Sequence, residues 1–242
     1  MKHFPVLLPL LASLAALFSP LQLTAVLATT TNYYVSPMGS DTNDGRSAET
    51  PFFSIQKAVN LAYPDDLINL ASGIYLQDIK SYRHGTASAP ITIQGPSSAI
   101  VQGAGNARII QITHDYLTLD GFTVDGLFGD PNLVTGYRKK LLYAIGTQPL
   151  DGVTGLRLLH MTFRNAADEC VRLRYFSQRN EIAYSTITGC GIEDFKFNGG
   201  SKNGEGIYVG TANEQLGLNG APTYDPDQSN NNWVHHLSLI HI

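Results

Sequence analysis

Two stretches of the sequence carry charged residues at matching positions around a short apolar pattern. Residues Asp168–Arg174 read Asp-Glu-Cys-Val-Arg-Leu-Arg, and residues Gly204–Gly210 read Gly-Glu-Gly-Ile-Tyr-Val-Gly. Aligning the apolar positions places Glu169 opposite Glu205, and in neighbouring parallel strands the two would lie about 4.8 Å apart. At an effective dielectric constant of about 20, two carboxylates at that separation repel by roughly 3–4 kcal/mol. Such a pair must share a proton, bind a cation or face basic side chains.

The acidic residues in and around this pair have the chemistry of a calcium site. Ca²⁺ binds hard oxygen ligands, which carboxylates supply. The candidate ligands are Asp168, Glu169, Asp194 and Glu205. Calcium is the cofactor that this pattern suggests.

Basic and aromatic side chains near the pair could in addition hold an acidic ligand and move a proton. A general base must lie within reach of the proton that it removes, and a lysine or arginine in this role needs a lowered pKa. The candidates for the base are Lys202 and Arg174. The candidates for binding the substrate are Arg172, Lys196 and Tyr208. The alternative interpretation is a structural ladder of glutamates and arginines on the protein surface.

The elements that must position these residues repeat along the chain. The stretches Tyr116–Gly126, Gly155–Asn165 and Asn180–Gly189 align with one another, and the interval from Leu158 to Ile182 is 24 positions. A period in the twenties with short alternating apolar triplets is typical of a solenoid. The positions that we expect to stack in the core are Leu119, Leu158 and Ile182 in one set and Val124, Phe163 and Ile187 in the other.

The residues in the repeat favour one kind of solenoid. Leucine-rich repeats have a similar period, but their L-x-x-L-x-L-x-x-N pattern is absent, and β-branched and aromatic residues fill the apolar positions. These residue types favour short strands, so we predict an all-β fold, a parallel β-helix in which adjacent coils pair. Insertions are expected at about residues 127–140, 193–203 and 213–230.

The start of the solenoid needs a cover for its first open coil. Thr50 and Pro51 are suited to the N-cap and first position of a helix. Apolar residues then follow at helical spacing, namely Phe52, Ile55, Val59 and Ala62. The sequence therefore predicts a short N-terminal capping helix, followed by Leu67–Leu70 as the first strand.

The first 28 residues have the order of a secretory signal peptide. Lys2 and His3 give a positive start, and an apolar run extends from Phe4 to Leu27. A membrane anchor is the alternative, but three prolines interrupt the run and no charged stop-transfer segment follows it. We expect a signal peptide over residues 1–28, a β-helix domain over residues 29–242, and a secreted, extracellular protein.

Composition limits the classes of partner. Charged residues make up 15% of the 242, below the roughly 25% of typical proteins, and the formal net charge is −4. Nucleic-acid-binding proteins are usually basic, so we expect no nucleic-acid partner. No segment after the signal approaches the length of a membrane span, and we expect a monomer that stays off the membrane once the signal is removed.

The sequence contains two cysteines, Cys170 and Cys190. An exported protein meets an oxidising environment, in which an even pair favours a disulfide. The repeat alignment puts Cys170 on a strand and Cys190 at the corner after Ile187, so the two are offset rather than stacked. A disulfide needs Cα atoms within about 7 Å of each other. Both a disulfide and two buried thiols stay open, and the offset favours the thiols.

The end of the sequence is unusual. The repeat pattern stops inside a coil, and residues 237–242 resemble translated sequencing adapter, so they are candidates for non-native sequence. We expect a fragment that is incomplete at its C-terminus.

The N-terminal part of the sequence resembles the opening segment of secreted right-handed parallel β-helix proteins of the pectate-lyase-like superfamily. The resemblance extends over about residues 33–234. The motifs that carry it are Tyr33–Pro37, Gly39–Asp41, Asn43–Gly45, Pro51–Ala58 and Ala71–Tyr75.

This resemblance implies a fold and a class of ligand. Many members of the superfamily are carbohydrate-active, among them pectate lyases, chondroitinase-type lyases and epimerases. Lyases of uronic-acid polymers neutralise the sugar carboxylate with a cation or basic cluster and remove the proton α to it with a basic residue, often beside Ca²⁺. Our hypothesis is a secreted β-helix that binds or processes polysaccharide by such β-elimination. The alternative is a non-catalytic structural or adhesive solenoid.

Overall fold

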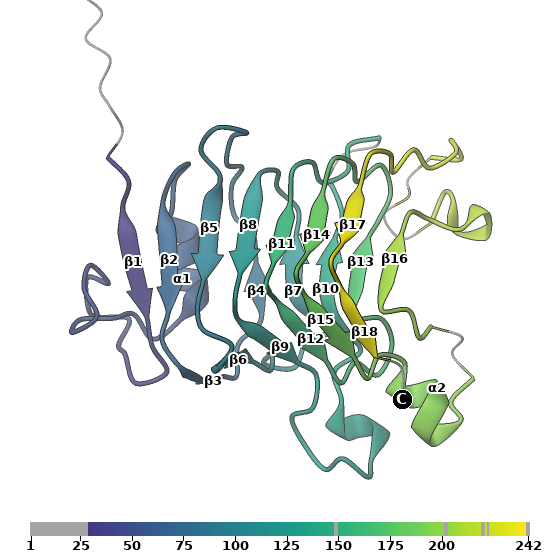
Figure 1. The fold of residues 1–242 in the computed structure, drawn as a ribbon, viewed down its shortest axis with the longest axis horizontal. Coiled ribbons are helices and arrows are strands. Elements are labelled where there is room, and N and C mark those ends of the chain that lie inside the picture. The colour runs from purple at the N-terminus through teal and green to yellow at the C-terminus, as the bar shows by residue number, and fades with distance from the viewer. Residues whose placement is uncertain (1–28, 148–149, 201–202, 219–220, 222, 241–242) are drawn as a thin grey trace, which may run out of the picture.

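The structure is a computed structural model that describes residues 29–147, 150–200, 203–218, 221 and 223–240. Within these residues the chain winds through three parallel sheets, and successive coils follow one another along the long axis of the molecule (Figure 1). Sheet A contains β1 (Asn32–Val35), β2 (Leu67–Leu70), β5 (Ile91–Gln94), β8 (Leu117–Asp120), β11 (Arg157–Leu159), β14 (Glu181–Ala183) and β17 (Trp233–His235). This arrangement confirms the predicted parallel β-helix.

The other two sheets complete each coil. Sheet B contains β3 (Gly73–Tyr75), β6 (Ala99–Val101), β9 (Thr123–Asp125), β12 (Thr162–Arg164), β15 (Thr186–Thr188) and β18 (Ser238–Ile240). Sheet C contains β4 (Ile79–Lys80), β7 (Arg108–Ile112), β10 (Lys140–Ala144), β13 (Val171–Leu173) and β16 (Ile207–Val209). Crossovers between parallel strands of one sheet are almost always right-handed, because the strands themselves twist that way.

The predicted stacking of the apolar residues is confirmed. In sheet A, Leu158 pairs with Leu119 on one side and Ile182 on the other. In sheet B, Phe163 pairs in the same way with Val124 and Ile187. All six side chains belong to one continuous buried core. The apolar repeat thus fixes which face of each strand points inward.

The capping helix begins later than the sequence predicts. α1 spans Ile55–Leu61 with Ser54 at its N-cap, and Ile55, Ala58 and Val59 are buried. Phe52 stays extended because its backbone N–H donates to the carbonyl of Tyr34 at 2.8 Å and its own carbonyl accepts from Ser36 at 2.9 Å. The predicted first strand, Leu67–Leu70, is in fact the second, β2. It pairs with β1, which precedes the helix.

The three expected insertions carry short helices. The first holds a 3₁₀ helix, η1 (Val134–Gly136), the second holds α2 (Ile192–Phe197), and the third holds a 3₁₀ helix, η2 (Asn213–Gln215). The predicted signal peptide lies outside the described residues. Of the helices that the structure describes, none has the length and apolar character needed to cross a membrane.

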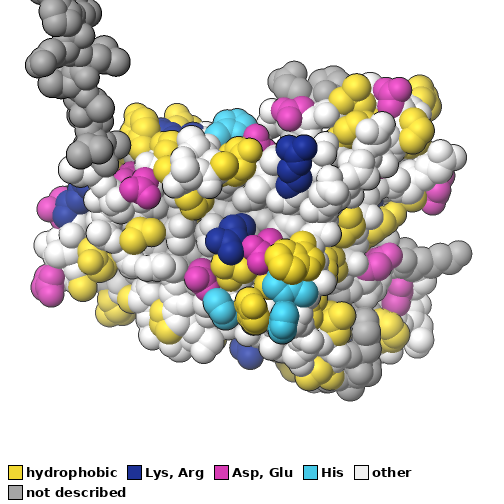
Figure 2. Space-filling view, turned by 45° about the horizontal axis from the view of Figure 1, so that its top comes forward, with side chains coloured by type: hydrophobic (Ala, Val, Ile, Leu, Met, Phe, Trp, Pro, Cys, Tyr) yellow, Lys and Arg dark blue, Asp and Glu magenta, His cyan; other side chains and the backbone are white. Residues whose placement is uncertain are grey.

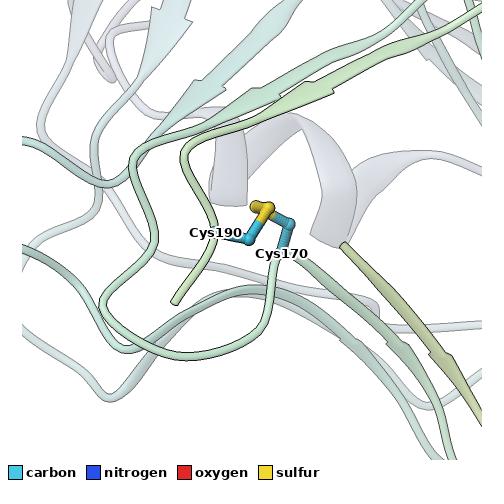
Figure 3. Close-up of a disulfide and its surroundings, with 2 residues drawn as sticks. All are labelled: Cys170 and Cys190. Carbon is cyan, nitrogen blue, oxygen red and sulfur yellow. A yellow bond between two sulfur atoms is a disulfide. The ribbon is translucent and has the colours of Figure 1, made fainter. Parts of the chain in front are cut away.

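Cys170 and Cys190 form a disulfide, with Cα atoms 5.6 Å apart (Figure 3). The preference for two thiols was wrong, because the chain turns back after β15. The Gly191 N–H donates to the Asp168 carbonyl at 2.7 Å, and this contact draws the corner against the start of β13. A bridge closing a loop of this length stabilises a fold by about 3 kcal/mol in the chain-entropy description. It anchors the strand that carries the candidate site.

Candidate functional site

The pairing of sheet C places one residue from each of its strands in a single row. The register aligns each member with the next, and neighbouring strands lie about 4.8 Å apart. The row consists of Lys80, Gln111, Tyr143, Arg172 and Tyr208. Two of the predicted substrate-binding residues, Arg172 and Tyr208, are therefore direct neighbours.

Glu169 is fully buried and both of its carboxylate oxygens have basic partners. Lys140 Nζ lies 2.8 Å from Oε2, and Arg172 Nη1 lies 2.5 Å from Oε1. Two cationic partners offset the cost of burying this carboxylate. Lys140 was missed in the sequence because it stands one coil earlier, at the end of an insertion whose length breaks the repeat.

Glu205 occupies the coil after Glu169, as the alignment predicts. Val171 pairs with Ile207, and the Cys170 N–H donates to the Glu205 carbonyl at 3.2 Å. The Glu205 side chain is partly exposed, but its Oε2 atom is buried and has no hydrogen-bond partner among the described residues. The basic partners expected near the glutamate pair are present on the Glu169 side.

Asp168 is a buried acid, and one of its two carboxylate oxygens has no hydrogen-bond partner among the described residues. Its Oδ2 lies 3.6 Å from Lys140 Nζ, whereas Oδ1 is buried without a partner in the described chain. Burial raises the pKa of Asp168, and the attraction of Lys140 and Lys139 offsets only part of this shift. Across the described ranges, no three His, Cys, Asp or Glu side chains are grouped so as to hold a metal ion.

Arg172 and Arg174 converge on one acceptor atom. Arg172 Nη2 and Arg174 Nη1 each donate to Gln215 Oε1 at 3.0 Å, and Arg174 Nη2 also donates to the Leu218 carbonyl at 3.5 Å. The two arginines are 3% and 5% exposed, and the Nε atom of each is buried without a partner in the described part of the chain. The Arg172 guanidinium lies 4.1 Å from the centre of the Tyr208 ring. Gln215 comes from the third insertion, and no spacing in the sequence indicates it.

The remaining predicted residues are Lys196 and Asp194, which lie on α2, and Lys202. Lys196, on α2, donates to the Pro131 carbonyl at 2.6 Å and lies 5.9 Å from the Tyr137 ring centre, so it ties α2 to the first insertion. Asp194 lies in the first turn of the same helix. Lys202 falls outside the described residues.

A second cluster of aromatic and charged side chains lies on the face formed by sheet A. Glu181 accepts hydrogen bonds from Arg157 Nε at 2.8 Å and His235 Nε2 at 3.2 Å, while the His160 ring stacks on Tyr184 at 5.4 Å. Burial would raise the pKa of Glu181, but the hydrogen bonds from Arg157 and His235 make the net shift downward. Figure 2 shows histidines gathered beside basic, acidic and hydrophobic side chains on this face. In this cluster the Glu181 carboxylate is already paired with Arg157 and His235.

Known structures resemble the fold. No protein-family model and no curated protein matches the chain. The chain is similar to an alginate lyase from Paenibacillus sp. str. FPU-7, with 25% identity and a TM-score of 0.60 over 77% of this chain and 55% of the lyase. It is also similar to the pectate lyase Pel9A, with 19% identity and a TM-score of 0.52 over 67% of this chain and 40% of that one. The chain thus spans about half the length of these structures, whose likeness confirms a parallel β-helix of the pectate-lyase type.

Proposed function

We propose that the protein is a secreted polysaccharide-processing β-helix that cleaves a uronic-acid polymer by β-elimination on sheet C. The observation that carries this proposal is the convergence of Arg172 and Arg174 on Gln215 Oε1. Two guanidinium groups directed at one oxygen form a recognition site for a carboxylate, which binds arginine more strongly than an amide does. The alginate and pectate lyases of similar fold support the same class of substrate.

The arginine pair would stabilise the negative charge that develops on the substrate carboxylate, which is the first requirement of the reaction. Removing the proton α to a uronate carboxylate places negative charge on that group, and fixed cations stabilise this charge most in a buried site. The base takes the C5 proton, the electron pair of the broken C–H bond forms the C4–C5 double bond, and the C4–O bond breaks. The departing oxygen then takes a proton from a general acid or from water.

The two candidate bases, Arg174 and Lys202, differ in how readily their side chains lose a proton, and we assign them different roles. Arginine stays protonated in proteins, and Arg174 is buried with both terminal nitrogens bonded. We therefore assign carboxylate binding to Arg174 and Arg172, with Tyr208 beside them, and the base to Lys202. Lys202 precedes Glu205 by three positions in the segment that follows α2. Lys196 stays a proposal for contact with more distant sugars, since its ammonium group is held by the first insertion.

Two buried carboxylate oxygens are the reason for including calcium in the proposal. Asp168 Oδ1 and Glu205 Oε2 are carboxylate oxygens without partners in the described chain, which suits a hard cation. Glu169 is not part of this set, because Lys140 and Arg172 hold its two oxygens. Ca²⁺ held by these two oxygens and by water would supply further positive charge beside the substrate carboxylate. Asp194 would contribute only through a bound water, since it does not form a group of three acids with Asp168 and Glu205 in the described residues.

The proposal is tested by incubating the purified protein with alginate and pectate and recording the ultraviolet absorbance of the unsaturated product. We expect Arg174→Gln to lower kcat/KM by at least about 100-fold, as for loss of a charge-stabilising donor. Arg157→Gln is the matched control, since Arg157 pairs with Glu181 on sheet A, and it should retain activity. Absence of unsaturated product from every uronate polymer would contradict the lyase proposal.

A second candidate is a non-catalytic solenoid that only binds polysaccharide. The burial of Arg172 and Arg174 beneath Gln215 favours it over catalysis at that pair, because buried groups cannot reach reacting atoms, whereas binding could use other, exposed faces of the solenoid. Binding of uronate polymers without any unsaturated product would identify this function.

A further inference from the structure

A pocket of about 570 Å³ lies at the N-terminal end of sheet C. It opens between α1, β4, β7 and the turn before β7. Its polar lining consists of Gln56, Asp78, Lys80, Asn106, Arg108 and Gln111. The pocket therefore belongs to the same sheet as the arginine pair but to earlier coils.

Hydrogen bonds hold the walls of the pocket, and these bonds do not use the Lys80 ammonium group or the Arg108 guanidinium. Gln56 accepts from the Lys80 N–H at 2.8 Å and donates to the Lys80 carbonyl at 2.9 Å. The two carboxylate oxygens of Asp78 accept the N–H groups of Ala104 and Asn106, each at 3.0 Å. The single acid of the pocket is thus engaged in holding the turn before β7.

The two cations of the pocket have no acidic partner. Within the described residues, neither Lys80 nor Arg108 forms an ion pair. Lys80 is exposed, and the Arg108 guanidinium lies over the Tyr143 ring, with its central carbon 3.7 Å from the ring centre. A guanidinium that lies over an aromatic ring retains N–H donors for other partners, and Arg108 lines the pocket. Two positive groups beside the amide of Gln111 fit a ligand that carries both an anionic group and hydroxyls.

The pocket and the arginine site are linked by the row of side chains across sheet C. Lys80, Gln111, Tyr143 and Arg172 are consecutive members of the row across sheet C, so three strand spacings, roughly 14 Å, separate its ends. Tyr143 joins the two regions, because Arg108 lies on its ring and the Arg172 guanidinium is 6.0 Å from the ring centre. A polymer with a carboxylate on each sugar could meet both regions at once.

We propose that this pocket is a subsite for a carboxylated sugar of the same polymer, remote from the bond that is cleaved. The inference rests on the proposed function for the identity of the polymer. Lys80 and Arg108 bind the carboxylate, and Gln111 binds a hydroxyl group. The subsite makes the protein prefer long uronate chains to short ones.

Calorimetric binding of oligouronates of increasing length to the whole protein tests the subsite. We expect Lys80→Gln and Arg108→Gln each to weaken binding of the longest oligomers about ten-fold, the loss of one charge-assisted hydrogen bond, and to leave disaccharide binding unchanged. Arg157→Gln should bind like the wild type. Carboxyl-reduced oligomers should bind the wild type and both variants equally.

Two results would separate the subsite from the lyase proposal, and a third would test the assignment of the subsite to a carboxylate. Unchanged long-oligomer binding in both variants, with binding still lost in Arg174→Gln, overturns the subsite and leaves the lyase proposal standing. Loss of long-oligomer binding in Lys80→Gln without any unsaturated product from the wild type supports the subsite and refutes the lyase. Stronger binding of a sulfated oligosaccharide that lacks uronate overturns the assignment to a carboxylate.

Discussion

Replacing Gln215 by glutamate tests whether the arginine pair is a carboxylate site. In the structure, one neutral oxygen accepts a hydrogen bond from each arginine, both at 3.0 Å. A carboxylate at the same place turns each bond into an ion pair, a gain of about 1 kcal/mol per bond after desolvation. A substrate carboxylate must displace this built-in competitor, so the total of about 2 kcal/mol predicts a KM about 30-fold higher for Gln215→Glu.

Gln215→Ala should have the opposite effect. It removes the competing oxygen, so we expect a lower KM with kcat retained. Gln94→Glu is the matched control, since it makes the same charge change on β5 of sheet A. KM is measured from the rate of unsaturated product, and direct oligouronate binding gives the same comparison. An unchanged KM in Gln215→Glu, or an equal rise in Gln94→Glu, would refute the carboxylate site.

Three further predictions concern the residues beside the arginine pair. Replacing Cys170 and Cys190 together by serine should lower the free energy of unfolding by about 3 kcal/mol in denaturant titration, whereas two free thiols in the denatured, unreduced protein would exclude the bridge. Because burial raises the pKa of Asp168 in the folded state, the stability of the wild type should fall relative to Asp168→Asn as pH rises above 3.8, the ordinary pKa, as measured by thermal unfolding across that range. Glu205→Gln should abolish calorimetric Ca²⁺ binding at little cost in stability, and unchanged binding would remove Glu205 from the calcium proposal.

The repeat made the core predictable because each coil places equivalent apolar residues at the same inward-facing positions. A β-branched or aromatic residue at an inward position stacks on its equivalent in the next coil, so alignment of Leu158 with Ile182 already gives the register. The same register brought Glu169 and Glu205 into adjacent coils without any knowledge of the turns between them. The predicted register of the stacked core residues was therefore confirmed, although Leu67–Leu70 is the second strand and Cys170 lies just before β13.

Predictions that depended on turns were less successful. α1 starts at Ile55 rather than Pro51, because Phe52 pairs with β1 instead of entering the helix. The disulfide depends on how the chain turns after Cys190, which the period of the repeat does not specify. Lys140 opens β10 directly after one insertion and Gln215 lies in another, and the irregular lengths of both insertions meant that no alignment could place these residues beside Glu169 and Arg172.

The placement of the site relative to the core decides which variants can report on function. The main core consists of inward-facing residues, whereas Leu216 packs with Tyr175 and Phe176 in a separate small cluster. Gln215 is held at the edge of that small cluster, so its substitution acts on the arginine pair without removing any core side chain. Glu169 is different, because its loss leaves the buried Arg172 without its carboxylate and costs about 3–5 kcal/mol. Loss of activity in a Glu169 variant would therefore reflect unfolding as much as chemistry, whereas variants of Gln215, Lys80 and Arg108 separate the two.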